Sequence, residues 1–276
     1  MSVLYCEGAE NSPDVRLLGL LLGDVVGEIV PWGGKDGLPA MVNRGRRKGQ
    51  PVCALIDGDF PRDPDAWAYS DEACVWEQGK EAESKVQLGW RWRRKEVENY
   101  LLDPLVLAGA LGWSIDQTND YHAVLERVFD DIAVHTAARM ALTVCAPKRN
   151  RLKTDINLGD DLAAVRATLE SRAKAHDDEA KVDVEVLLRW FDALGPRCQK
   201  GPFRQHAVSA FAGKNLLARL QNTPGVEKID RNLKVGTKLY SPLISALESK
   251  GPAIIDWLPE WRSLHDAVAA WSPPTA

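Results

Sequence analysis

The sequence predicts an α/β protein in which a parallel sheet with flanking helices is followed by a mostly α-helical region. Up to about residue 105, short apolar runs alternate with helical patterns, which is the order of a parallel sheet built from βαβ units. After about residue 116, apolar residues recur at spacings of three and four without a further convincing strand, as in successive helices. We therefore expect an α/β domain over residues 1–115 and a helical domain over residues 116–276.

The α/β part is expected to hold four strands, because short runs there are apolar or partly alternating and are bounded by turn residues. These runs are Val3–Cys6, Glu28–Pro31, Val52–Ile56 and Lys85–Trp92. One helix is expected from Pro13 to Leu22, with Ser12 as its N-cap, and another over Leu38–Arg47. The stretch 60–83 is polar and rich in Pro and Asp, and it is expected to be a long loop.

The region after residue 116 is expected to contain successive helices, separated in places by segments that contain Pro and Gly. The expected helices are Tyr121–Leu142, Leu162–His176, Val184–Leu194, His206–Leu220, Leu239–Lys250 and Trp257–Trp271.

The composition limits the classes of function that the protein can have. A hydrophobic content of 45% and a charged content of 27% are ordinary for a globular protein. The net charge of −4 gives no overall attraction to nucleic acid, so any such contact must come from local basic patches. Five cysteines without a CxxC pair, and without a secretion signal, favour a reducing cytoplasm over disulfides or a zinc site. The longest apolar run, Leu17–Leu22, is too short to span a bilayer.

Acidic residues follow two of the expected strands. Glu7 follows the first strand, and Asp57 and Asp59 follow the third. With the first strand central, these carboxylates would meet at the carboxyl ends of neighbouring parallel strands, where open α/β sheets bind ligands. Oxygen ligands of this kind suit Mg²⁺ or Mn²⁺, so the pattern predicts a metal-dependent phosphoryl-transfer site. The alternative is that Glu7 caps a helix and residues 57–59 form a turn.

A further acidic pair, Glu96 and Glu98, lies at the expected junction between the fourth strand and a helix. Residues two apart on a helix do not share a face, so at most one of the two is expected to point into the site, and Glu98 is preferred. The alternative is that both acids complement the positive end of the helix dipole.

Basic residues lie immediately before this pair and are expected to bind nucleic acid. They are Arg91, Arg93, Arg94 and Lys95. They interleave with Trp90 and Trp92, and arginine beside exposed aromatic rings suits single-stranded nucleic acid. The alternative is that the two tryptophans form the buried face of a strand. Lys214 is a further candidate phosphate contact, although its surroundings lack the pattern of a Walker A loop and a lysine at the edge of the core is the alternative.

Taken in order, these motifs resemble a TOPRIM domain, the α/β metal-binding module of topoisomerases, primases and OLD-type nucleases. The motifs are Glu-Gly at 7–8, Asp14, Asp-Gly-Asp at 57–59 and Glu-Asn-Tyr-Leu-Leu at 98–102. The chain is most similar to the AriB-like TOPRIM nuclease subunits of PARIS anti-phage systems, which share related segments at 31–34 and 211–214. The likeness covers the first 105 residues, and in the helical remainder only the Gly-Lys segment.

The resemblance implies a set of site residues. Glu7, Asp57 and Asp59 would bind the metal and act in catalysis, with Glu98 as a further ligand or orienting residue. Asp14 is a weaker candidate, because it lies seven residues beyond Glu7 whereas many TOPRIM proteins have this acid sooner.

The resemblance also implies a function. It suggests a Mg²⁺-dependent endonuclease that is restrained by an ATPase partner and released on phage infection, with tRNA or other RNA favoured over DNA and with a homodimer as a form of the activated state. The alternative is a non-catalytic TOPRIM-fold subunit that docks on an ATPase. A primase or topoisomerase is disfavoured, because the chain is short and shows no polymerase or strand-passage domain.

Overall fold

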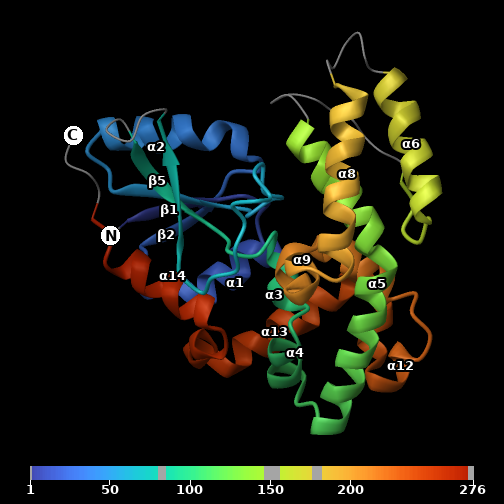
Figure 1. Ribbon diagram of the computed structural model, residues 1–276. Coiled ribbons are helices and arrows are strands. Elements are labelled where there is room, and N and C mark those ends of the chain that lie inside the picture. The colour runs from blue at the N-terminus through green and yellow to red at the C-terminus, as the bar shows by residue number, and fades with distance from the viewer. Residues whose placement is uncertain (1, 80–84, 146–155, 176–181, 273–276) are drawn as a thin grey trace. The chain divides into compact units, whose positions relative to one another are not determined.

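A computed structural model describes residues 2–79, 85–145, 156–175 and 182–272 (Figure 1). The chain divides into two compact units. Unit 1 comprises Met1–Gly58, Ser70–Trp113 and Lys238–Ala276, and unit 2 comprises Asp59–Tyr69 and Ser114–Thr237. Each unit is therefore assembled from segments that are distant in the sequence.

Unit 1 is built on a five-stranded, mostly parallel sheet with the strand order β2-β1-β3-β5-β4. The strands are β1 (Val3–Cys6), β2 (Glu28–Pro31), β3 (Val52–Ile56), β4 (Cys74–Gln78) and β5 (Val86–Arg91). β1 pairs in parallel with both β2 and β3, and β3 pairs in parallel with β5. The α/β class and the four expected strands are thus confirmed. The first and third strands are neighbours as expected, but the middle strand of the sheet is β3 and not β1.

β4 corrects the expectation of a long loop over residues 60–83, of which residues 80–83 lie outside the described part of the chain. β4 pairs antiparallel with β5, and the register shifts between Trp76 and Glu77. It forms one edge of the sheet, and Val75 on it is exposed. A short edge strand of this kind carries little of the apolar pattern by which strands are recognised.

Helices cover both faces of this sheet. In Figure 1, α2 (Leu38–Arg47) lies on one side of the strands, and α1 (Pro13–Leu22) and α14 (Pro259–Ala269) lie on the other. α2 packs through Leu38 and Val42 on a core that includes alternate residues of β3. α1 begins as expected, since the Ser12 hydroxyl accepts the backbone N–H of Val15 and Pro13 occupies the first turn.

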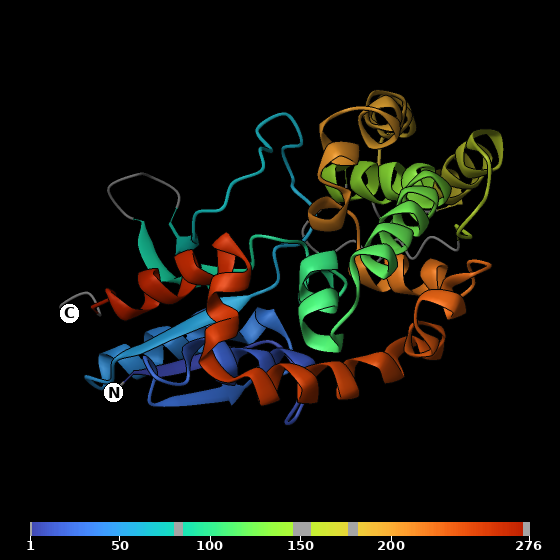
Figure 2. The same cartoon turned by 90° about the horizontal axis from the view of Figure 1, so that it is seen from below.

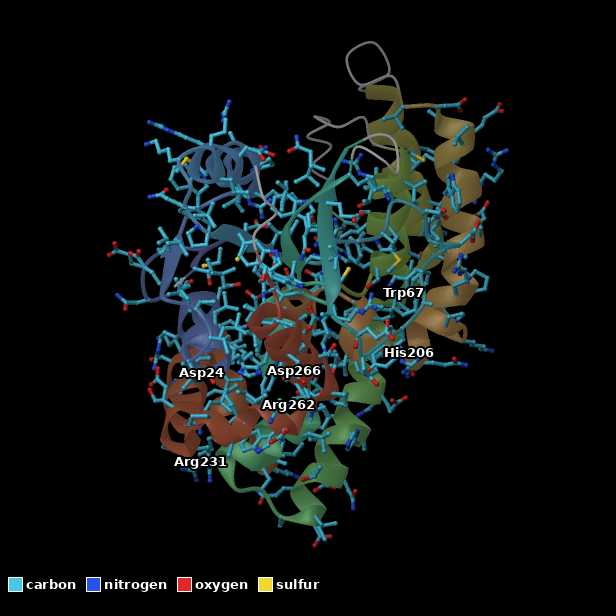
Figure 3. All side chains as sticks on the ribbon, turned by 90° about the vertical axis from the view of Figure 1, so that its left-hand side faces the viewer. Asp24, Trp67, His206, Arg231, Arg262 and Asp266 are labelled. Atoms are coloured by element: carbon cyan, nitrogen blue, oxygen red, sulfur yellow. The ribbon has the colours of Figure 1, made fainter. Side chains whose placement is uncertain are left out.

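The last part of the chain belongs to the sheet unit, which differs from the single boundary expected at residues 115/116. This segment contains α13 (Tyr240–Lys250), the 3₁₀ segment η4 (Gly251–Trp257) and α14. Figure 2 shows it, coloured from orange to red, running beside the blue part of unit 1. α13 and α14 contact α1, and α13 also contacts α4 (Pro104–Leu111). Beside α14, Asp24 and Asp266 lie near each other in Figure 3, and both approach the ring of His265.

Apart from Asp59–Tyr69, unit 2 is helical in its described residues, as expected. Its elements are α5 (Ile115–Cys145), α6 (Leu162–Ala175), α8 (Val184–Gln199), α9 (Pro202–Gln205), α10 (Ala207–Ala210), α11 (Gly213–Leu220), α12 (Val226–Ile229) and η3 (Arg231–Leu239), which ends in unit 1. The helix expected over His206–Leu220 is interrupted, because Phe211 is extended between α10 and α11. None of the helices in the described parts of the chain combines the length and apolar character needed to cross a bilayer.

The segment Asp59–Tyr69 leaves the sheet after β3 and packs within unit 2. Trp67 lies beside His206, as Figure 3 shows, with the ring centroids 6.1 Å apart. The ring of Tyr69 stacks on His206 with the centroids 4.4 Å apart. Arg197 binds Asp65 through Nη1 at 2.6 Å. A segment that follows β3 in the sequence is therefore fixed to the helices of unit 2.

Candidate carboxylate site

The site is built at the carboxyl ends of β1 and β3, which are neighbouring parallel strands. Glu7 follows β1 and Asp57 follows β3, and the backbone N–H of Asp57 donates to Oε1 of Glu7 at 3.1 Å. Both side chains are half-buried. The structure thus brings together the first two acids that the sequence predicts for the site.

Asp14 joins these acids because Gly8 allows the chain to turn tightly. Gly8 has a φ of +117°, and a Cβ added to it would lie 2.6 Å from Oγ of Ser12 and 3.7 Å from Cβ of Asp14. Only glycine fits this conformation and this close approach. Asp14, in the first turn of α1, is consequently held near the end of β1 despite its distance from Glu7 in sequence. Asp14 and Glu7 both contribute, after burial, to raising the pKa of the Cys6 thiol to about 12.

The pKa of the Asp57 carboxyl shows how the acids of the site affect one another. This pKa is raised from 3.8 to about 7, first by burial and then by four surrounding carboxylates in the order Asp14, Glu7, Glu96 and Glu98. Loss of water and proximity of like charges both disfavour the ionised form of an acid. The end of β3 is therefore a place where negative charge accumulates.

Glu96 and Glu98 reach this place through the segment after β5. The backbone N–H of Trp92 donates to the Ile56 carbonyl at 2.8 Å. A Cβ added to Gly58 would lie 2.3 Å from the Arg94 carbonyl oxygen, so the two strand ends touch through their main chains.

Both of these glutamates are buried, and both contribute to the raised pKa of Asp57. Glu96 is the N-cap of α3 (Val97–Leu101) and has extended backbone angles. The face rule for residues two apart on a helix therefore does not apply to it.

Arg94 does not line the site as a substrate contact, which corrects the sequence prediction. Its side chain is buried, and its Nη1 donates to Oδ2 of Asp103 at 2.6 Å while its Nε donates to Oε1 of Glu260 at 2.9 Å. The guanidinium also lies over the ring of Tyr100, 4.8 Å from its centroid. The Tyr100 hydroxyl accepts the backbone N–H groups of Arg93 and Arg94 at 3.1 and 3.2 Å. This network holds the segment that connects β5 to Glu96.

The other predicted basic residues differ in their environments. Lys95 has its Nζ 3.6 Å from Oε2 of Glu96, with both side chains largely buried. Arg91 and Arg93 are half-buried, and the Nε atom of each is buried without a hydrogen-bond partner among the described residues. Trp90 and Trp92 are buried, so the alternative that they form the covered face of a strand is the correct one. These two tryptophans cannot stack on a nucleobase from the surface.

Asp59 and Lys214 belong to unit 2, whereas the acids of this cluster belong to unit 1. Asp59 is exposed and has a left-handed φ of 56°, a conformation that aspartate adopts more readily than most residues. It is not one of the four acids that act most strongly on Asp57. Lys214 is exposed in the first turn of α11.

The residues present suit a hard divalent cation. The donors around Asp57 are all carboxylate oxygens, which Mg²⁺ and Mn²⁺ prefer, and the raised pKa of Asp57 marks an excess of negative charge. Among the described residues, no three His, Cys, Asp or Glu side chains are gathered into a complete ligand set. Like charges without a cation between them repel one another.

The sequence missed two participants in this region and preferred Glu98 over a third, Glu96. Glu96 carries no distinguishing pattern beside Glu98. Asp103, followed by Pro104, has the pattern of a helix N-cap, which it is, but nothing in the sequence pairs it with Arg94. Glu260 lies 166 residues from Arg94 in the sequence, and only the folded chain brings the two together.

No protein-family model matches the chain. No curated protein matches it either.

Proposed function

We propose that this chain is a divalent-metal-dependent nuclease of the TOPRIM type that hydrolyses a phosphodiester bond in nucleic acid, with RNA preferred. The observation that carries the proposal is the pKa of about 7 at Asp57, which burial and four neighbouring carboxylates cause together. Ordinary folding does not require that acids from the end of β1, from α1 and from the start of α3 gather around an acid at the end of β3. Charge of this density becomes favourable once a cation is bound, and perturbed acids cluster at functional sites.

Glu7 and Asp57 would hold the cation, and Asp14, Glu96 and Glu98 surround them. A bound Mg²⁺ or Mn²⁺ would supply a water of lowered pKa and neutralise charge on a phosphate. Glu7 is oriented by the Asp57 N–H, which donates to its Oε1 atom. Glu96 is held at its backbone by Oδ1 of Asn99, which accepts the Glu96 N–H at 3.0 Å.

Arg91 and Arg93 would meet the phosphate. Arg91 ends β5 in register with Ile56, directly before Asp57, and each arginine has a buried Nε that lacks a partner within the described part of the chain. A guanidinium in this position compensates charge on a phosphate oxygen. Arg94, in contrast, keeps the same segment in place from within the core.

The cytoplasmic location, the ATPase partner and the role in phage defence rest on the sequence resemblance alone and belong to the same proposal. In that setting the partner restrains the nuclease until infection. The free chain would then harm the cell that expresses it.

The decisive experiment is a cleavage assay with purified protein on tRNA, single-stranded RNA and duplex DNA, in Mg²⁺, Mn²⁺ or EDTA. We expect cleavage that requires the divalent ion and is lost in Asp57→Asn. Asp256→Asn is the matched control, because Asp256 is an exposed partner of Arg262 in unit 1 and its loss should leave cleavage unchanged. Cleavage that survives both EDTA and Asp57→Asn contradicts the proposal.

Expression in a bacterial host distinguishes the nuclease from the alternative, a non-catalytic binding subunit. A free nuclease should slow growth, and Glu7→Ala should relieve the effect because it removes the acid held by the Asp57 N–H. Equal growth with both chains, together with no cleavage of any substrate in vitro, would favour a binding subunit.

A further inference from the structure

Trp32 is the most exposed tryptophan in the described part of the chain, with 41% of its surface accessible. Most large aromatic side chains are covered in folded proteins, and Trp90, Trp92 and Trp261 are fully buried here. A single exposed aromatic ring is not informative by itself. The position and the support of Trp32 are what make it informative.

Trp32 lies beside the carboxylate site by strand register. Pro31, the last residue of β2, pairs with Cys6, so Trp32 and Glu7 follow the ends of two adjacent strands. The backbone N–H of Trp32 donates to the Cys6 carbonyl at 2.9 Å. Two more hydrogen bonds join Gly33 and Gly8, at 2.9 Å and 3.2 Å. The main chain that carries the indole is thus fixed to the main chain that carries Glu7.

The indole is supported on one side and open on the other. Its ring meets Tyr5 edge-on, with the centroids 6.1 Å apart. A Cβ added to Gly37 would lie 2.7 Å from its Nε1, so the backbone at Gly37 lies close to the indole edge. Gly33 and Gly34 follow it, and a Cβ added to either would have open space within 4 Å as far as the described residues extend. An approaching ligand would meet an aromatic ring and bare backbone.

We propose that Trp32 is a nucleobase-stacking residue that selects an unpaired nucleotide next to the scissile phosphate. This inference rests on the proposed function and names its substrate class. A base in a duplex is stacked on its neighbours and cannot offer its face to a side chain, whereas a base in a loop or a single strand can. Trp90 and Trp92, which the sequence suggested for this role, are covered, and Trp32 presents the exposed ring.

The test measures binding without cleavage. A short single-stranded RNA with 2-aminopurine in place of one base is titrated with the full chain carrying Asp57→Asn in Mg²⁺, and the anisotropy of an end label and the 2-aminopurine emission are recorded. Adding Trp32→Leu should weaken binding about tenfold and abolish the quenching of 2-aminopurine, since base stacking on an aromatic ring contributes strongly to affinity. Adding Trp32→Phe should keep both within about threefold, because a ring remains.

Two controls separate stacking from damage to the fold. Tyr69→Leu makes the same kind of change at an exposed aromatic residue of unit 2 and should leave binding unchanged. A blunt duplex of the same sequence should bind equally to the Trp32 variants. Thermal unfolding identifies any variant that fails to fold. If Trp32→Leu does not fold, the stacking role is judged from the binding and quenching of Trp32→Phe compared with those of the parent chain.

The outcomes distinguish this inference from the proposed function. Cleavage by the wild-type chain that is indifferent to Trp32→Leu overturns the stacking role alone. Binding and quenching that depend on Trp32, in a chain that never cleaves, uphold the stacking role and overturn the nuclease. Equal losses on single-stranded RNA and duplex, or no binding of the RNA by any chain, overturn the stacking role.

Discussion

Replacing Asp57 by Asn should make the metal-free protein more stable at alkaline pH, although it removes the residue placed at the centre of the site. The pKa of the Asp57 carboxyl is raised from 3.8 to about 7 by burial and by the surrounding acids. Since each pKa unit corresponds to about 1.36 kcal/mol, ionising this carboxyl in the folded chain costs at most about 4 kcal/mol. Asn has nearly the same shape and carries no charge, so the substitution removes that cost.

The sign of the pH dependence follows from proton linkage. Between pH 3.8 and about 7 the folded chain binds the Asp57 proton more tightly than the unfolded chain does. Its contribution to the free energy of unfolding therefore falls as pH rises through this window, and the full cost is present above it. Asp57→Asn should thus change stability little at about pH 4 and raise it by about 2–4 kcal/mol at about pH 8.

The assay is urea unfolding of both chains in EDTA at the two pH values, followed by the same measurement with Mg²⁺. The ion should stabilise the wild-type chain more than Asp57→Asn, because a ligand that binds only the folded state raises its stability. Asp256→Asn, which removes an exposed ion pair with Arg262, should leave stability nearly unchanged in the same assay, because exposed ion pairs contribute little. Asp57→Asn that is less stable than wild type at about pH 8, or equally stabilised at both pH values, would refute the reasoning.

Three further substitutions test the parts around this acid. Glu260→Gln removes a charged acceptor from the buried Arg94, which holds the β5–α3 segment. It should lower the free energy of unfolding in urea by about 2–3 kcal/mol and weaken Mg²⁺ binding measured by calorimetry. Unchanged Mg²⁺ affinity would contradict a positioning role. Gly58→Ala places a Cβ 2.3 Å from a main-chain carbonyl and should cost about 1–3 kcal/mol and reduce cleavage. Gly19→Ala in α1, with open space around it among the described residues, should do neither. Asp59→Asn keeps a residue type that tolerates the left-handed φ of 56° at this position. We expect it to lose less cleavage rate than Asp57→Asn does. An equal loss would indicate that Asp59 is as important to the metal site as Asp57.

The carboxylate site shows how a fold can hold charges that oppose one another. Glu7 is tied to the backbone of Asp57, and Glu96 is tied to Asn99 by a backbone N–H that donates to the Asn99 side chain. In the core, the ion network of Arg94, Asp103 and Glu260 holds the segment that leads to Glu96. A buried ion network of this kind adds less to stability than its Coulombic attraction suggests, because its charges must lose their water. Its effect is to fix the path of the chain between β5 and Glu96.

The sequence by itself determined the local elements of the sheet unit. The apolar runs at β1, β3 and β5, the Ser-Pro start of α1 and the acid after each of β1 and β3 were all readable, because strand burial and helix capping depend on residues close together in the chain. Right-handed crossovers leave few arrangements for consecutive βα units, and the observed one places β1 between β2 and β3. The sequence predicted that Glu7 and Asp57 meet on the condition that the first strand lies beside the third, and the pairing of β1 with β3 fulfils that condition.

Only the tertiary structure decided which elements share a unit and which side chains are covered. An amphipathic helix shows that it buries a face but not against what, so the return of α13 and α14 to the sheet could not be read from their pattern. Trp90 and Trp92 alternate with arginines, a pattern that suits both a covered and an open face, and packing covered them. Arg94 became a core residue because Glu260, far away in sequence, supplies its second carboxylate. Long-range pairing depends on the geometry of the whole fold, which local sequence spacing does not contain.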